Sequence, residues 1–160
     1  MTIRSTVKAI IIQDDKILLQ CCWDDKLKLD YYELPGGGQL PMEKMEDALI
    51  RECLEETGYH VAVIRFFGVA EEIITVDPVS RDYLDHLHRI FHIFLCRIKN
   101  VPQGSHSEED PHQIDVRWFP INEVPSLRLR PPPLRSALIP LLKSGEPGYL
   151  GTYLLADFNE

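Results

Sequence analysis

The sequence predicts one mixed α/β domain, with helices packed on a largely antiparallel or mixed sheet. Three observations predict this class. The 160 residues suffice for one domain with a hydrophobic core. Several short apolar segments are separated by turn residues, and two further segments have helical spacing. The hydrophobic fraction of 44% is that of a globular chain. We find no internal repeat or long linker, so we expect a single domain over residues 1–160.

The first part of the chain begins with a β-hairpin signal. Residues 7–12 are apolar, two aspartates mark a turn, and residues 16–21 form the returning strand. Residues 21–32, CCWDDKLKLDYY, are expected to form a polar loop with aromatic side chains. The stretch YELPGGG then ends a short strand in a glycine turn at residues 36–38.

Residues 43–57 are predicted to form a helix. The alternation of a strand is absent here, and one stripe at three- and four-residue spacing contains Met45, Ala48, Leu49, Cys53 and Leu54. Gly58 follows at the position of a helix C-cap glycine. The glycine turn and this helix therefore form one loop–helix unit.

The second part of the chain is predicted to be rich in strands. We expect strands over residues 60–76, 86–98 and 115–121. A polar loop is expected over residues 100–113, and a short helical turn follows the third strand. Residues 132–145, PPLRSALIPLLKSG, predict a late helix that Pro140 would kink or split.

Charge and composition argue against several classes of function. The net charge of −8 disfavours binding to a nucleic-acid polymer or an anionic membrane. No stretch approaches the roughly 18 apolar residues that span a bilayer, and the first residues lack the layout of a signal peptide. The four cysteines form no C-x-x-C pair, so they are expected to be reduced and buried. We therefore expect a cytoplasmic protein.

Glu52, Glu55 and Glu56 indicate a metal site. On a helix their side chains lie about 5–6 Å apart, where like charges repel. They also lie near the helix C-terminus, where the macrodipole disfavours anions. A hard cation such as Mg²⁺ would remove this cost and would favour carboxylate ligands. The alternative is a solvated acidic face of the helix, partly balanced by Arg51.

The spacing of the whole segment from Gly37 to Tyr59 resembles the Nudix box. The pattern of that family is G-x5-E-x7-R-E-U-x-E-E-x-G-U, with U a bulky apolar residue. Gly37 fits the first position, Glu43 follows after five residues, and Arg51 after seven more. Cys53 and Tyr59 fill positions that are more often aliphatic. The stretches ELPGGG and VRWFPINEVP are also similar to the family.

The resemblance implies a Nudix fold, an α/β/α sandwich around a mixed sheet with the box (residues 37–59) as a loop–helix–loop. It implies hydrolysis, with Mg²⁺ or Mn²⁺, of the pyrophosphate bond in a nucleoside diphosphate linked to another moiety. Four kinds of substrate stay open: nucleotide sugars, ADP-ribose-like compounds, nucleoside triphosphates and dinucleoside polyphosphates. The implied partner is a small-molecule nucleotide, and a homodimer is plausible by the same resemblance. The alternative is a Nudix-like nucleotide-binding regulatory domain without turnover.

The resemblance also implies roles for individual residues. Glu52, Glu55 and Glu56 are implied as catalytic metal ligands. The implied substrate-binding residues are Gly36, Gly37, Gly38 and Arg51, with Glu43 as structural support. Arg51 is also implied to support the loop and the ligands by ion pairing.

Two sets of residues outside the box are further candidates. The acidic loop offers Glu108, Glu109, Asp110 and Asp115 as a general base, of which we favour Glu109. The alternative is an exposed acidic loop. His86, His88 and His92 share one face of a predicted strand, which favours a polar face over a metal site.

Overall fold

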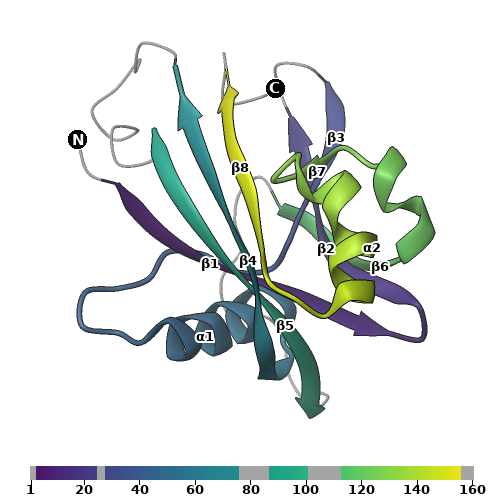
Figure 1. Cartoon of the computed structure of the whole chain (residues 1–160). Helices are drawn as coiled ribbons and strands as arrows, with labels where there is room; N and C mark the ends of the chain where they lie inside the picture. The colour runs from purple at the N-terminus through teal and green to yellow at the C-terminus, as the bar shows by residue number, and fades with distance from the viewer. Residues whose placement is uncertain (1–2, 25–27, 76–86, 101–112, 156–160) are drawn as a thin grey trace.

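A curved mixed β-sheet organises the chain (Figure 1). The computed structural model describes residues 3–24, 28–75, 87–100 and 113–155. The strands are β1 (Arg4–Gln13), β2 (Lys16–Asp24), β3 (Leu29–Glu33), β4 (His60–Ile74), β5 (His88–Asn100), β6 (Gln113–Pro120), β7 (Leu129–Arg130) and β8 (Gly148–Leu155). The helices are α1 (Met45–Thr57), the 3-10 helix η2 (Ile121–Ser126) and α2 (Leu134–Ser144).

Strand β1 connects the two halves of the sheet. It pairs antiparallel with β2 at the hairpin end, where Ile12 faces Ile17, and then runs parallel to β5 from Arg4 to Ile11. On the β5 side the order continues through β4 to β8, and on the β2 side through β3 to β7, with β6 also paired to β2. The predicted mixed sheet is confirmed, because it contains both antiparallel and parallel pairs.

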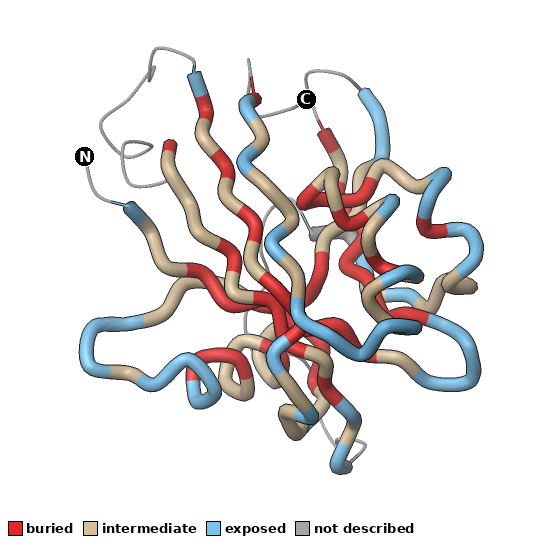
Figure 2. The backbone as a smooth tube through the Cα atoms, viewed as in Figure 1, coloured by how far each residue is buried: buried red, intermediate tan, exposed pale blue. Residues whose placement is uncertain are grey.

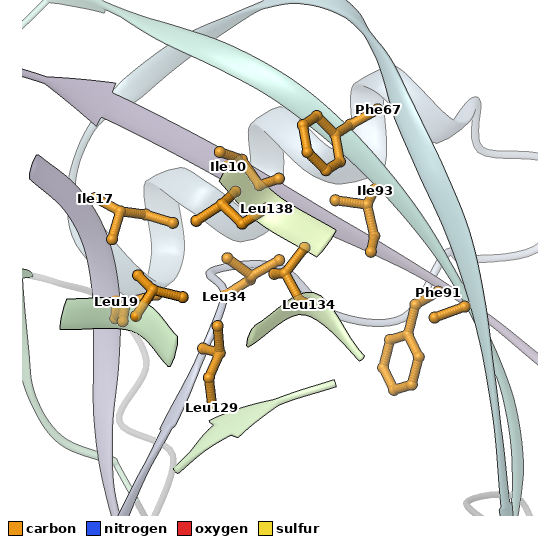
Figure 3. Close-up of a cluster of buried hydrophobic side chains, with 12 residues drawn as sticks. Ile10, Ile17, Leu19, Leu34, Phe67, Phe91, Ile93, Leu129, Leu134 and Leu138 are labelled. Atoms are coloured by element: carbon orange, nitrogen blue, oxygen red, sulfur yellow. The ribbon is translucent and has the colours of Figure 1, made fainter. Parts of the chain in front are cut away.

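Each face of the sheet carries its own hydrophobic cluster and its own helix. Along β1, Ile10 belongs to the cluster that contains Leu134 and Leu138 of α2 (Figure 3). The alternate residues, such as Ile11, belong to the cluster that contains Leu49 of α1. Since side chains of a strand alternate between faces, the two helices cover opposite faces. The predicted α/β/α sandwich is confirmed.

The predicted helix of the box is confirmed, with a start at Met45 rather than residue 43. Ala48, Leu49 and Cys53 are buried along it, as the apolar stripe predicts, whereas Leu54 is half-buried and Met45 is exposed. Gly58 caps the helix with φ of 73°, and its N–H donates to the Leu54 carbonyl oxygen at 2.9 Å. In Figure 2 the loop that leads into α1 is exposed, whereas one face of the helix is buried.

Three expectations about the strands and helices need correction. Residues 21–32 are largely strand rather than loop, because β2 and β3 pair from Gln20 with Glu33 to Asp24 with Leu29. Strand β8 was not expected, and it is held by parallel pairing with β4. Pro140 does not split helix α2, which runs without interruption from Leu134 to Ser144.

All four cysteines lie in the described part of the chain, where they form no disulfide, and their expected burial is confirmed. None of the helices that the structure describes is long and apolar enough to cross a membrane.

Candidate active site

Strand β1 holds the glycine loop by main-chain hydrogen bonds. The Val7 N–H donates to the Gly37 carbonyl oxygen at 2.9 Å, and the Ala9 N–H donates to that of Pro35 at 2.8 Å. The pairing of β1 with β2 is confined to the hairpin end, so the loop takes the place that β2 leaves beside β1. The loop is thereby fixed next to α1, which follows it in the chain.

Two of the glycines are required by close approaches within this loop. Gly36 has φ of 124°, and a Cβ atom there would lie 2.2 Å from the Val7 carbonyl oxygen. A Cβ atom on Gly37 would lie 2.4 Å from Oε2 of Glu52. A side chain at either position would therefore displace the loop or the Glu52 carboxylate. The glycine turn predicted from the sequence thus lies directly against one of the predicted metal ligands.

Arg51 is the centre of the hydrogen-bond network of the box. Its guanidinium forms a bidentate pair with Glu43, with distances of 2.9 and 3.0 Å, and Nη2 also donates to the Gly38 carbonyl oxygen at 3.1 Å. Nη1 donates to Oε1 of Glu52 at 2.8 Å and to Oε2 of Glu55 at 3.2 Å. Arg51 therefore joins the loop to the helix and brings two predicted metal ligands together.

Glu43 lies in the loop before α1, where it supports the box. Its Oε2 accepts a hydrogen bond from the Leu40 N–H at 2.9 Å, and its carbonyl oxygen accepts one from Nε2 of Gln39 at 2.7 Å. The hydrogen bonds from Arg51 and Leu40 lower the pKa of Glu43 to about 2. Glu43 is therefore ionised at neutral pH and can hold Arg51 in place.

The three predicted metal ligands do not yet converge on one point. Glu52 and Glu55 share Nη1 of Arg51, whereas Glu56 turns inward and accepts a hydrogen bond from the Gly36 N–H at 2.6 Å. Among the described residues, no three Asp, Glu, His or Cys side chains form a ready metal-binding group. The contacts of Arg51 with two of these carboxylates account for this arrangement.

The donor set nevertheless suits a hard divalent cation. Oε2 of Glu52 and Oε1 of Glu55 form no hydrogen bond within the described ranges, and the two side chains are 16% and 27% exposed. Carboxylate oxygens with free lone pairs are the ligands that Mg²⁺ prefers. A cation at this position would take over part of the charge balance that Arg51 supplies.

Glu56 lies half-buried near the end of α1. Burial raises the pKa of Glu56 to about 7, although the charge of Lys8 and hydrogen bonds from Gly36 and Gln20 lower it. The carboxyl group therefore changes its ionisation near neutral pH. A bound cation would favour the ionised form.

Lys8 and Glu33 also belong to the surroundings of the site, and the sequence reasoning missed them. The Lys8 ammonium donates to the Gly36 carbonyl oxygen at 2.6 Å and to Oε2 of Glu33 at 3.3 Å. The available signal was a lysine within the apolar run VKAIII of β1. A charge within a buried strand needs a partner, but the sequence does not say which.

Of the four candidates for the general base in the acidic loop, only Asp115 lies in the described residues. Glu108, Glu109 and Asp110 lie outside the described residues, so Glu109 as general base stays a prediction. Asp115 lies on β6, where its exposed side chain accepts a hydrogen bond from Nε of Arg117 at 2.9 Å.

Two of the three histidines of the predicted strand, His88 and His92, lie in the described part of β5. Nε2 of His88 lies 2.7 Å from Oε1 of Glu71. His92 is half-buried on the same strand face, and His86 lies outside the described residues. Within those residues, His88 and His92 belong to no group of three possible metal-binding side chains.

Comparison with known proteins gives an independent line of evidence. The model of the NUDIX domain family matches residues 2–142. A solved NUDIX hydrolase from Nitrosomonas europaea has a similar structure, with a TM-score of 0.69 and 23% identity. The similarity covers 91% of this chain and 92% of that one. At this identity the likeness concerns the fold.

Two curated relatives match over shorter segments. A candidate mutator protein of Mycobacterium tuberculosis, MutT4, is 32% identical over 59% of this chain and 35% of its own length. A candidate 8-oxo-dGTP diphosphatase of Bacillus subtilis is 50% identical over 24% of this chain and 26% of its own length. The chain thus spans about a third or less of the length of these relatives.

Proposed function

Because this chain belongs to the NUDIX domain family, we propose that it hydrolyses the pyrophosphate bond of a nucleoside diphosphate linked to another moiety. The cation would be Mg²⁺ or Mn²⁺, held by Glu52, Glu55 and Glu56. The observation that carries the proposal is the excess of carboxylates in the box. Arg51 bonds Glu43, Glu52 and Glu55 at once, and two of the ligand carboxylates keep an oxygen free.

The cation, when bound, neutralises phosphate charge and lowers the pKa of a coordinated water. The residues of the chain supply position. Gly37 leaves room for the Glu52 carboxylate, and Arg51 orients Glu52 and Glu55 by direct hydrogen bonds. Glu43 fixes Arg51 in turn, as the outer partners of metal ligands commonly do. Positioning and electrostatics carry most of the catalysis of phosphoryl transfer.

Gly36, Gly37, Gly38 and Arg51 are proposed to contact the substrate as well. The loop in which the glycines lie could approach the diphosphate closely, because it presents no side chain there. The four residues that accept hydrogen bonds from Arg51 are all in the box, which supports an orienting role at least as strongly. Glu109 is the proposed general base.

The identity of the moiety beyond the diphosphate is the open part of the proposal. The name of the Bacillus subtilis relative supports a nucleoside triphosphate, but its match covers only 24% of this chain. Nucleotide sugars and ADP-ribose-like compounds belong in the same test. The proposed partner is a small-molecule nucleotide and not a nucleic-acid polymer, which agrees with the net charge of −8.

Release of phosphate-containing products from a nucleotide panel tests the proposal. The purified chain is assayed with Mg²⁺, with Mn²⁺ and with a chelator, beside Glu52→Gln and the matched control Glu46→Gln. Glu46 is exposed in the first turn of the same helix. We expect turnover that needs metal, that Glu52→Gln abolishes and that Glu46→Gln retains. A folded chain that binds nucleotides without turnover would instead support a regulatory nucleotide-binding domain.

A further inference from the structure

Lys8 is a buried cation whose hydrogen bonds end on the segment that leads into the box. The residue is 6% exposed. Its ammonium donates to the carbonyl oxygens of Gly36 at 2.6 Å and Leu34 at 3.0 Å, and to Oε2 of Glu33 at 3.3 Å. An ammonium has three N–H donors, so these three acceptors use its whole capacity. Lysine is seldom buried to this extent unless it is paired.

Lys8 and Glu56 hold the same glycine from its two sides. The Gly36 carbonyl oxygen accepts from Lys8, and the Gly36 N–H donates to Oε2 of Glu56 at 2.6 Å. The φ of Gly36 is 124°, a conformation that favours glycine. A rotation of the backbone at Gly36 would therefore break both contacts, and it would leave the Glu56 carboxylate without this donor.

We propose that Lys8 is a positioning residue for the reaction, which sets the orientation of the Glu56 carboxylate through Gly36. The proposal rests on the proposed function, in which Glu56 is a metal ligand. It adds a residue of β1, far from the box in sequence, to the groups that prepare the site. Lys8 does not contact the substrate in this account.

The main-chain hydrogen bonds of the loop keep it attached to β1 when the Lys8 side chain is changed. The positioning role of Lys8 can therefore be tested apart from the attachment of the loop. The Val7 and Ala9 N–H groups hold the loop on either side of Lys8, and they do not depend on the Lys8 side chain. Lys8→Met keeps a long side chain in a buried position but removes every donor. The loop is then still attached to β1, while the Gly36 carbonyl oxygen loses its partner.

Ser5 provides a matched control. It lies on the same strand, and its hydroxyl donates to Oε1 of Gln39 in the same loop at 2.9 Å. Ser5→Ala therefore removes one bond between β1 and the loop without touching Gly36. A role in attachment alone would make the effects of Ser5→Ala and Lys8→Met similar in kind.

The first measurement is steady-state kinetics with Mg²⁺ on the substrate found for the wild type. For Lys8→Met we expect kcat to fall about 10- to 100-fold, as for outer partners of metal ligands. KM should change little, and half-maximal activity should need more Mg²⁺. Lys8→Arg, which keeps the charge, should recover part of kcat, and Ser5→Ala should resemble the wild type. A folded Lys8→Met with the kcat and Mg²⁺ dependence of the wild type would overturn the proposal.

The second measurement is independent of turnover. The amide proton of Gly36 is observed by NMR in the wild type, Lys8→Met, Lys8→Arg and Glu56→Gln. We expect a downfield resonance in the wild type, because a buried carboxyl group accepts this hydrogen bond, and its loss in Lys8→Met. If Lys8→Met does not fold, the Gly36 resonance of Lys8→Arg is compared with that of the wild type. The guanidinium cannot place three donors as the ammonium does, so a shift is expected there too. A Gly36 resonance unchanged in the folded lysine variants would contradict the proposal, even if no substrate is found. Failure of the proposed function would appear separately, as absence of turnover in the wild type.

Discussion

Two arginine–glutamate clusters in this protein differ in the balance of their charges. In the box, Arg51 bonds Glu43, Glu52 and Glu55. Between β4 and β5, Arg89 forms an ion pair with Glu72. The other carboxylate oxygen of Glu72 accepts a hydrogen bond from the hydroxyl of Tyr153 on β8 at 2.7 Å. One cluster has more anions than its arginine can neutralise, and the other is balanced.

The two clusters differ in exposure as well. The Glu72 side chain is 0% exposed and that of Arg89 is 20% exposed, whereas the Arg51 side chain is 29% exposed. A buried and balanced pair has no capacity for a further ion, and loss of one partner leaves a buried charge. A partly exposed cluster with free carboxylate oxygens can accept a cation from solution. The comparison teaches that charge balance and access separate a structural ion pair from a binding site.

The largest effect on stability is expected from a substitution in the balanced cluster of Arg89 and Glu72. Glu72→Gln leaves the Arg89 charge without its partner, so the free energy of unfolding should fall by about 3–5 kcal/mol. The kcat of the molecules that stay folded should be unchanged. Denaturant unfolding measures the first quantity and active-site-normalised kinetics the second. Glu71→Gln, whose partners His88 and Thr152 are partly exposed, is the control and should destabilise far less. Equal losses in both variants would remove the distinction between the clusters.

In the box we expect a large loss of turnover and little change in stability, the opposite of the effect at the balanced cluster. Glu55→Gln should lower turnover by at least about 100-fold, since even outer partners of metal ligands cost 10- to 100-fold. The free energy of unfolding should change little, because the substitution removes one of several like charges. Steady-state kinetics and thermal unfolding of the same preparation check both statements. Retention of wild-type turnover by Glu55→Gln would exclude this residue as a ligand.

Substitution of Arg51 extends the comparison of the two clusters, because it leaves the carboxylates of the box without the arginine that bonds them. Without a metal, Arg51→Met should lower the free energy of unfolding by about 1–2 kcal/mol, through lost hydrogen bonds and repulsion among the carboxylates. Addition of Mg²⁺ should recover more stability in this variant than in the wild type. Thermal unfolding with Mg²⁺ and with a chelator measures the difference. An identical response to Mg²⁺ in both proteins would argue against a cation at this cluster.

The smallest effect is expected from a change of pH, which should alter the affinity for Mg²⁺. Without a metal, the pKa of Glu56 is about 7, so below this pH a proton occupies the carboxylate that the cation needs. Mg²⁺ affinity should therefore fall as pH decreases below about 7, by up to about tenfold per pH unit, and should level off above it. Calorimetric titration from pH 5.5 to 8.5 measures this dependence. Glu56→Gln should bind Mg²⁺ more weakly, with a flatter profile, and a flat profile in the wild type would contradict the account.

The sequence predicted the parts of the fold that local patterns determine. The apolar spacing of Ala48, Leu49 and Cys53 and the glycine after Thr57 are sufficient to place α1. The hairpin of β1 and β2 follows from two apolar runs about a short turn. The end of strand β3 was predicted, but its start at Leu29 was missed, because charged residues between Trp23 and Tyr31 hide a pairing with β2 that tertiary structure stabilises. Strand β8 depends on pairing with β4, which no local pattern reveals.

The same limit applies to the candidate site. The spacing of the box predicts its glutamates, glycines and Arg51, because all of them lie within one segment. Lys8 lies 28 residues from Gly36, and its role depends on the attachment of the loop to β1. That attachment is a non-local contact, so only the structure reveals it.

Binding of Mn²⁺, followed by electron paramagnetic resonance, tests the central claim most directly. The wild type is compared with the double variant Glu52→Gln/Glu55→Gln and with Glu71→Gln, and nucleotide turnover is assayed in the same samples. The account predicts that the wild type and Glu71→Gln bind Mn²⁺ and turn over substrate, and that the double variant loses both. Mn²⁺ binding of wild-type strength in the double variant, or turnover in the presence of a chelator, would contradict it.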